Sequence, residues 1–200
     1  MRSRPMTATL TAEKPEHGDA IERVLDRAFG PGRFAKTSER VRERGAVLEH
    51  ALSRVALDEA GDVIGVCRIW RVEAGVPLYF LGPLAVDPGA QSAGLGLKMV
   101  QDCVAACRAI GASGIVLVGA ERFFRPAGFM LAPADRISLP GPVDPHRSLC
   151  QNRRGEFRAK VSGGDRPVPA KKFAPAVLTK RAVNSKRRDV SCGRRSAGLH

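Results

Sequence analysis

The chain of 200 residues is 44% hydrophobic and 26% charged, which is the composition of one globular domain with a short appended segment. No apolar run approaches the ~20 residues of a membrane helix. The N-terminal MRSRPMTATL lacks the apolar core of a signal peptide, so we expect a cytoplasmic protein. The cysteines and histidines are scattered without a CxxC pair or ligand spacing, which argues against a disulfide framework and against a metal site.

The N-terminal region predicts a strand followed by two helices. TATLT alternates as a strand does, and Asp19 can cap a helix over AIERVLDRAF, where the apolar residues recur at helical spacing: Ile21, Val24, Leu25 and Phe29. The Gly30-Pro31-Gly32 stretch ends that helix. A more polar helix covers SERVRERG, with Ser38 as its predicted cap.

Three strands are predicted next. Residues 55–57 and 63–72 read as a hairpin around a turn at 59–62. Residues 76–86, VPLYFLGPLAV, are apolar on both faces, which favours a central, buried strand. Pro83 cannot donate a ladder hydrogen bond, so we expect a bulge or a break there.

A helix follows Gly96 and presents one apolar stripe, formed by Val100, Cys103, Val104 and Cys107. We read the two cysteines as core residues, and Gly111 ends the helix. GIVLVGA (114–120) is a further buried strand, ERFFRPAGF (121–129) is a short helix that runs into a turn, and residues 136–139 and 156–161 are two candidate closing strands. This order predicts a mixed sheet with helices on both faces.

The periodic spacing of apolar residues that predicts helices and strands ends at about residue 162. Residues 163–200 hold ten basic residues against two acidic ones, a net charge of +8, whereas the other 162 residues carry +5. We therefore predict a flexible segment at 1–5, a domain over 6–162 and a disordered basic tail over 163–200. The tail could tether the domain to nucleic acid or ribosomes through weak, non-specific contacts, although it lacks interleaved aromatic residues and any recognised nucleic-acid module.

The stretch VDPGAQSAGLGLKMVQ (86–101) places two glycines at a helix start, where unpaired N–H groups and the helix dipole attract anions. It is not a P-loop, because Leu95 stands where that motif needs lysine. It is not a dinucleotide fingerprint either, because Met99 replaces the third glycine. Close packing of helix against sheet would explain one of the glycines but explains the whole run less well.

This segment resembles the acetyl-CoA-binding motif of the GNAT N-acetyltransferases. The pattern V-x-P-x-x-Q-x-x-G-x-G is met by Val86, Pro88, Gln91, Gly94 and Gly96. LGPLAV (81–86), GIVLVGA and AGF (127–129) look like the bacterial branch of predicted small N-acetyltransferases. The resemblance covers about residues 6–162 and implies an α/β (α+β) fold of the GNAT type, with a mostly antiparallel central sheet.

By this resemblance, acetyl-CoA is the co-substrate, and the residue spacings noted above predict no metal. The backbone amides of residues 92–96 would bind the pyrophosphate, the strand 84–86 would pair with the pantetheine arm, and the amide of Leu84 would stabilise the developing oxyanion. An exposed Lys98 could add charge near a phosphate. The implied cofactor-binding residues are Leu84, Ala85, Val86, Gln91, Ser92, Ala93, Gly94, Leu95, Gly96 and Phe124.

The sequence departs from the family at three positions. Phe124 stands where many members have a tyrosine general acid, Phe80 where histone-type members have a glutamate base, and Ala93 where a basic residue is common. The general acid and base therefore stay unassigned. Glu49, His50 and Glu73 are alternative candidates, each also consistent with an ordinary surface residue.

The acceptor is an amine of a small molecule or of a protein. Trp70 and Tyr79 could line an acceptor cleft, or could simply pack in the core. The alternative to an enzyme is a non-catalytic acyl-CoA-binding or sensor protein, which the two phenylalanines at proton-transfer positions favour.

Overall fold

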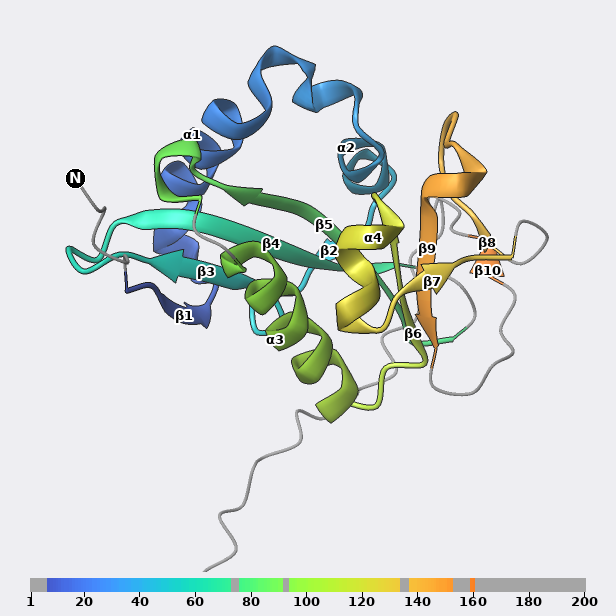
Figure 1. Cartoon of the computed structure of the whole chain (residues 1–200). Helices are drawn as coiled ribbons and strands as arrows, with labels where there is room; N and C mark the ends of the chain where they lie inside the picture. The colour runs from blue at the N-terminus through green and yellow to red at the C-terminus, as the bar shows by residue number, and fades with distance from the viewer. Residues whose placement is uncertain (1–6, 73–75, 92–93, 134–136, 153–158, 161–200) are drawn as a thin grey trace, which may run out of the picture. The chain divides into compact units, whose positions relative to one another are not determined.

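A mixed sheet organises the residues that the structure, a computed structural model, describes: 7–72, 76–91, 94–133, 137–152 and 159–160 (Figure 1). Its eight strands follow the order β1-β3-β4-β5-β6-β9-β7, and β2 also pairs with β4. The strands are β1 (Thr9–Ala12), β2 (Val47–Leu48), β3 (Arg54–Leu57), β4 (Val63–Val72), β5 (Leu78–Val86), β6 (Gly114–Val118), β7 (Met130–Leu131) and β9 (Ser148–Asn152). Within this sheet β5 and β6 are parallel, and the other pairs are antiparallel.

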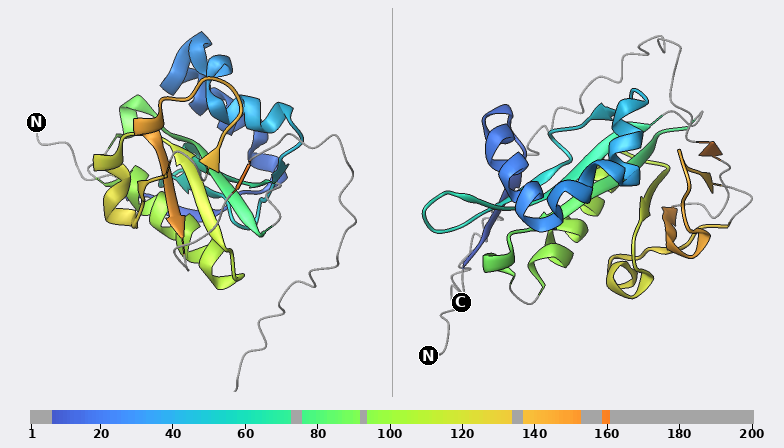
Figure 2. Two further views of the ribbon diagram at one scale, coloured as in Figure 1. Left: turned by 90° about the vertical axis from the view of Figure 1, so that its right-hand side faces the viewer. Right: turned by 90° about the horizontal axis from the view of Figure 1, so that it is seen from above.

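Helices cover both faces of the sheet, as predicted (Figure 2). On one face, α1 (Gly18–Phe29) packs its apolar stripe on β3, β4 and β5, and α2 (Thr37–Glu43) packs beside it. On the opposite face, α3 (Leu95–Ala109) buries the predicted stripe that includes Cys103 and Cys107. The short α4 (Glu121–Phe124) follows β6 and contacts α3. The 3-10 helices are η1 (Pro15–His17), η2 (Gly30–Ala35), η3 (Pro88–Ala90), η4 (Arg125–Ala127) and η5 (Pro145–Arg147).

The buried cysteines of α3 confirm the prediction that they are core residues. Cys103 Sγ lies 3.6 Å from the carbonyl oxygen of Cys67 on β4, and burial raises the pKa of the Cys107 thiol to about 12. A hydrogen bond with Cys103 and burial together raise the pKa of the Cys67 thiol. The Cys67 and Cys107 thiols therefore stay protonated at neutral pH, and all three cysteines fill space as small, buried groups.

The two predicted helix caps are wrong. A 3-10 turn over η1 brings the start of α1 back to Gly18, so Asp19 lies within the first helical turn instead of capping it. Similarly, α2 begins at Thr37 after an extended Lys36, and Ser38 lies within its first turn. Neither helix has a side-chain cap hydrogen bond. The negative charge of Asp19 still favours that end of α1 through the helix dipole.

The predicted irregularity at Pro83 is confirmed as a β-bulge. Cys67 of β4 faces Leu84, and two residues later Ile69 faces Leu81, so Arg68 stands opposite both Gly82 and Pro83. An extra residue in one strand re-aims the side chains beyond it. The consequence is direct here, because the bulge precedes the predicted cofactor strand 84–86.

The predicted closing strands are corrected by the structure. Ile137–Ser138 (β8) and Ala159–Lys160 (β10) pair with each other in a separate two-stranded parallel sheet. The central sheet is instead completed by β9 and β7, which the sequence analysis did not predict. The residues 1–6 and 161–200 lie outside the described residues, and so do the predicted flexible N-terminus and basic tail. In the described part of the chain, no helix has the length and apolar character needed to cross a membrane.

Candidate active site

The two central parallel strands separate where the cofactor strand was predicted. β6 pairs with β5 only over Leu78–Phe80, although β5 continues to Val86 and β6 continues to Val118 (Figure 1). Among the described residues, the second half of β5 has no strand partner on the β6 side. An unpaired strand edge presents N–H and C=O groups that an extended ligand can bind as an added strand.

The side chains around Leu84 turn away from this edge. Leu84 and Val86 pack on the cluster that α3 covers, whereas Ala85 is buried against α1 on the opposite face. Because side chains of a strand point to the two faces, the groups directed into the space beside β6 are backbone groups. Apolar side chains are therefore compatible with a polar binding edge at these positions.

The segment between β5 and α3 directs a helix N-terminus toward the same region. Asp87 accepts a hydrogen bond from the Gly89 amide at 2.9 Å and pairs with Arg27 of α1 at 2.6 Å, which fixes the turn after β5. Gln91 follows, exposed, and Ser92 and Ala93 lie outside the described residues. The first bond of α3 runs from the Lys98 amide to the Gly94 carbonyl.

The start of α3 has the features of an anion site. The N–H groups of Leu95, Gly96 and Leu97 precede the first helical bond, so they have no partner within the helix. The helix dipole adds about half a positive elementary charge at this end. Lys98 is exposed on the first turn, and the side chain of Leu95 is buried in the core, so Leu95 offers only its backbone.

The two glycines of the motif have different structural reasons. Gly94 has φ +99°, a conformation that other residues rarely adopt, and among the described atoms beyond its chain neighbours none lies within 4 Å of where its Cβ would stand. Gly96 has an ordinary helical backbone, but a Cβ there would lie 3.4 Å from Phe123 Cζ and 3.8 Å from Val86 Cγ2. Gly94 is thus required by the turn, whereas a side-chain methyl group at Gly96 would meet its neighbours at ordinary contact distances.

Phe124 of α4 is a core residue at the end of β6. It is 8% exposed, and its ring fills the space that a Cβ on Gly119 would need. It packs edge-on against Phe123, with ring centroids 4.8 Å apart. Phe123 in turn reaches Gly96, so the structure brings α4, the start of α3 and the end of β5 together. Sequence reasoning missed Phe123, although its position directly before Phe124 in a helix that follows β6 was a usable signal.

The remaining aromatic candidates lie in the core. Phe80 and Trp70 pack under α2, and the Trp70 indole N–H donates to the Gly82 carbonyl at 2.6 Å. Tyr79 lies on the opposite face, where β5 still pairs with β6, and burial raises the pKa of its hydroxyl. Trp70 and Tyr79 therefore do not line a common cleft.

The alternative titratable candidates lie apart from the cofactor strand. Glu49 follows β2, pairs with Arg71 at 3.2 Å and bonds through its amide to the carbonyl of Ile69 on β4. The ring of His50 lies 3.6 Å from Glu13. Both residues neighbour β4 through β2, whereas β5 pairs with β4 separately. Glu73 lies outside the described residues.

A buried ion pair that the sequence did not reveal is formed by Arg68, the residue of β4 that stands opposite the bulge. The Arg68 guanidinium bonds both oxygens of Glu13 at 3.0–3.2 Å and reaches Glu22 of α1 at 3.3 Å. Arg68 is 7% exposed and Glu13 is 4% exposed. Burying such a pair costs desolvation energy, which is offset only by good geometry. The pair ties the residue after β1 and helix α1 to the strand opposite Gly82 and Pro83.

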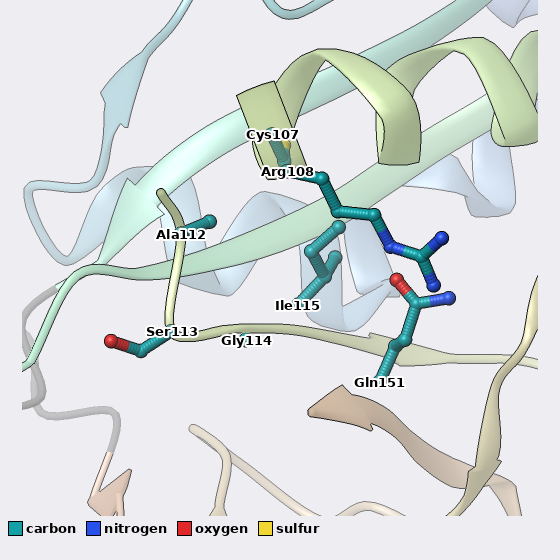
Figure 3. A pocket seen from close by; sticks show the side chains of 7 residues that line it. All are labelled: Cys107, Arg108, Ala112, Ser113, Gly114, Ile115 and Gln151. Carbon is teal, nitrogen blue, oxygen red and sulfur yellow. The ribbon is translucent and has the colours of Figure 1, made fainter. Parts of the chain in front are cut away.

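A small cavity of about 20 Å³ lies at the other end of α3 and is separate from the predicted site (Figure 3). The polar ends of Arg108 and Gln151 point toward one another there, and Gln151 donates to the Ala127 carbonyl at 2.5 Å. A volume of that size holds about one water molecule. None of the predicted cofactor-binding residues lines it.

Comparisons with known proteins agree with this geometry. A GNAT family N-acetyltransferase from Escherichia coli, solved in complex with CoA, is 24% identical, with a TM-score of 0.63 over 76% of this chain and 84% of that one. A GNAT family acetyltransferase from Brucella melitensis, solved in complex with acetyl-CoA, is 26% identical, with a TM-score of 0.52 over 74% of this chain and 97% of that one. None of the curated proteins compared with the chain matches it. The model of the Acetyltransferase (GNAT) family matches residues 19–129, more than half of the chain, and the protein therefore belongs to the GNAT acetyltransferase family.

Proposed function

We propose that the protein transfers the acetyl group of acetyl-CoA to an amine of a small molecule or of a protein, in the cytoplasm. The observation that carries this proposal is the unpaired edge of β5 beside the N-terminus of α3. The edge of β5 can form hydrogen bonds with an extended chain, and the N-terminus of α3 can donate hydrogen bonds to an anion. Acetyl-CoA has both parts, and the similar Brucella and Escherichia proteins were solved with acetyl-CoA and with CoA.

The pantetheine arm would lie along Leu84–Val86 and pair with the free edge of β5. Its pyrophosphate would accept hydrogen bonds from the N–H groups at the start of α3. Lys98 is close enough in the helix to add a screened attraction of its own. This arrangement uses backbone groups almost throughout, which is consistent with the apolar side chains at Leu84, Ala85, Val86 and Leu95.

The transfer itself forms one bond and breaks another. The neutral amine attacks the thioester carbonyl, the carbonyl oxygen gains negative charge beside the Leu84 amide, and the C–S bond then breaks to release CoA as a thiolate. An N–H donor aimed at that oxygen contributes roughly 3–4 kcal/mol to such reactions. The amine nitrogen loses its extra proton to water, and the thiolate takes up a proton from water.

Water is proposed for the proton steps because Phe80 and Phe124 carry no titratable group and are both buried. A thiol with a pKa of about 8.5 leaves as thiolate at modest cost. The rate should therefore follow the deprotonated fraction of the acceptor amine, rising with pH through the pKa of that amine. A plateau set by a group that titrates well below the acceptor amine would contradict this reading and implicate a protein side chain as the base.

The experiment that tests the proposal has two parts. Calorimetry with the full chain should show one acetyl-CoA bound per protein. Release of free CoA thiol should then be followed with a panel of amines that includes polyamines, amino sugars, amino acids and peptide N-termini. Absence of acetyl-CoA binding would overturn the proposal, whatever the amine.

A second candidate function is acyl-CoA binding without catalysis. The apolar burial of both Phe80 and Phe124 favours it, because proton-transfer groups are missing where the family resemblance implies them. Tight acetyl-CoA binding combined with no thiol release across the panel would support this function over the enzymatic one.

A further inference from the structure

The two faces of the sheet are not equally open to an acceptor at the proposed transfer site. With acetyl-CoA along Leu84–Val86 and its phosphates at the start of α3, the α3 face is filled by the cofactor, by α3 and by the buried ring of Phe124. An amine attacks a carbonyl carbon from above or below the plane of the thioester. The acceptor therefore has to arrive from the face that carries α1 and α2 (Figure 2).

Helix α2 stands on that face directly beside the bulge of β5. Ser38 Cβ lies 3.7 Å from the point that a Cβ on Gly82 would occupy, so the helix touches the strand there. Gly82 is two residues before Leu84, whose amide is the proposed oxyanion donor. The Gly82 carbonyl is already bonded to the Trp70 indole, and Phe80 is buried. Polar contacts with an acceptor must therefore come from α2 or from the segments next to it.

Arg40, two residues after Ser38, is a half-buried cation on this helix. None of the carboxylates that the structure describes forms an ion pair with it. Its side chain instead lies across Gly141, in the segment between β8 and β9, with Cδ and Cζ 2.9 Å and 3.0 Å from where a Cβ would stand. Packing rather than a carboxylate positions the guanidinium, so its donors are available to a ligand. A partly desolvated guanidinium binds a carboxylate with two parallel hydrogen bonds.

The carboxylates around the same face already have arginine partners. The pairs are Glu22–Arg33 at 2.8 Å, Asp26–Arg33 at 3.1 Å, Asp87–Arg27 at 2.6 Å and Glu39–Arg42 at 3.3 Å. In the described part of the chain, Asp19 and Glu43 have no such partner, but they lie in the first turn of α1 and at the last residue of α2, the two ends that point away from η2. A polyamine needs free carboxylates to bind its additional positive charges, whereas an acidic amine needs a free cation. The charges of this face fit the acidic amine.

We propose that the acceptor is an amine that also carries a carboxylate, and that Arg40 binds this carboxylate. The inference rests on the proposed function and names the class of acceptor, which that proposal leaves open. A free amino acid and an acidic peptide share this chemistry, so both belong in the test. Arg40 thereby determines specificity, while the Leu84 amide and the helix N–H groups serve every acceptor alike.

The test measures acceptor kinetics in the full-length protein. The carboxylate group of acceptors contains aspartate, glutamate and a peptide with Glu after its N-terminal residue. The second group contains spermidine and the same peptide with Gln in place of Glu and an amidated C-terminus. All rates are compared at equal concentrations of deprotonated amine, so that differences in amine pKa do not enter. We expect the highest kcat/KM in the carboxylate group, and the comparison of free amino acids with the peptide identifies the source of the carboxylate.

Arg40→Gln should then act on one group of acceptors only. We expect the KM of the carboxylate acceptors to rise about 10- to 100-fold, the loss of one charge-assisted contact, with kcat changed less than about 3-fold. The Kd of acetyl-CoA and the Tm should stay as in the unmodified protein. Arg40→Lys keeps the charge without the planar fork and should recover part of the loss. Arg44→Gln removes an exposed arginine from the C-terminal end of the same helix and is the matched control.

Three results would overturn the inference. The first is a preference of the unmodified protein for spermidine or the amidated peptide, and the second is an unaltered KM in Arg40→Gln. The third is an equal rise of KM in Arg44→Gln, because it would indicate a general effect of charge. If acetyl-CoA binds but no carboxylate amine is acetylated, the inference fails while cofactor binding stands. If acetyl-CoA does not bind at all, the proposed function itself fails, and this result cannot be confused with a selective effect of Arg40.

Discussion

Replacing the two motif glycines one at a time should separate fold from binding. At Gly94, alanine would have to adopt φ +99° in open space, so its cost is backbone strain and nothing else. Such strain is about 2 kcal/mol, and the stiffer unfolded chain of the variant offsets roughly 0.5 kcal/mol of it. The net loss of about 1.5 kcal/mol corresponds to a fall in Tm of about 3–6 °C for a domain of this size.

Gly96→Ala should behave in the opposite way. Its backbone is helical, and alanine is better than glycine in a helix by up to about 1 kcal/mol. The new methyl group, however, would stand 3.4 Å from the Phe123 ring, in tight but ordinary contact. We therefore expect a Tm at or above that of the unmodified protein. Because the methyl group would also stand beside the N–H groups proposed to bind the pyrophosphate, we expect the CoA affinity to fall about 10-fold.

The assays are a thermal melt and calorimetry with CoA, and the control is Gly94→Asn. Asparagine tolerates positive φ better than alanine does, so it should recover part of the lost Tm. The reasoning is refuted if the Tm of Gly94→Ala equals that of the unmodified protein. It is equally refuted if Gly96→Ala binds CoA as tightly as the unmodified protein while Gly94→Ala keeps its Tm.

Three further predictions concern the amide of Leu84, the buried ion pair and Phe124. Leu84→Pro removes the proposed oxyanion donor and should lower kcat about 100- to 1,000-fold. Leu84→Ala keeps the amide, so its kcat should fall by only a small factor. Circular dichroism and CoA binding check that the proline variant folds. Arg68→Met leaves the Glu13 carboxylate buried without its partner, so urea unfolding should show a loss of about 3–5 kcal/mol, much of it recovered in the double variant with Glu13→Leu. Phe124→Tyr should raise kcat most below pH 8.5 if protonation of the leaving thiolate limits the rate, and an equal effect at all pH values would exclude that explanation.

The elements with strong periodicity were predictable from the sequence. Three predicted elements are confirmed: the buried stripe of α3, the hairpin of β3 and β4, and the apolar strand β5, which is buried on both faces. The order of elements and the motif together also predicted the family, which the family model confirms.

The errors have a common physical cause, which is that long-range pairing overrides weak local signals. SLCQN forms β9 although only Leu149 is a strong apolar strand residue, because β6 offers it a complete antiparallel partner. Asp19 and Ser38 are good caps in isolation, yet the chain enters both helices one or two residues earlier. Arg68 and Glu13 are 55 residues apart, and no local pattern connects them.

The bulge at Gly82 and Pro83 shows how a backbone irregularity sets the chemistry of the strand. Before it, Tyr79 and Leu81 face α3 while Phe80 faces α2. After it, Leu84 and Val86 face α3 while Ala85 faces α1. Leu81 and Leu84 are three residues apart, and in a regular strand they would point to opposite faces. The extra residue keeps apolar side chains on the α3 face and leaves the lateral edge of residues 84–86 as backbone. It also explains why Tyr79 does not replace the missing hydroxyl at Phe124: Tyr79 precedes the bulge, in the part of β5 that β6 still covers. A reaction that relies on an amide at Leu84 and on helix N–H groups tolerates these apolar substitutions, because the groups it needs are present in every residue but proline.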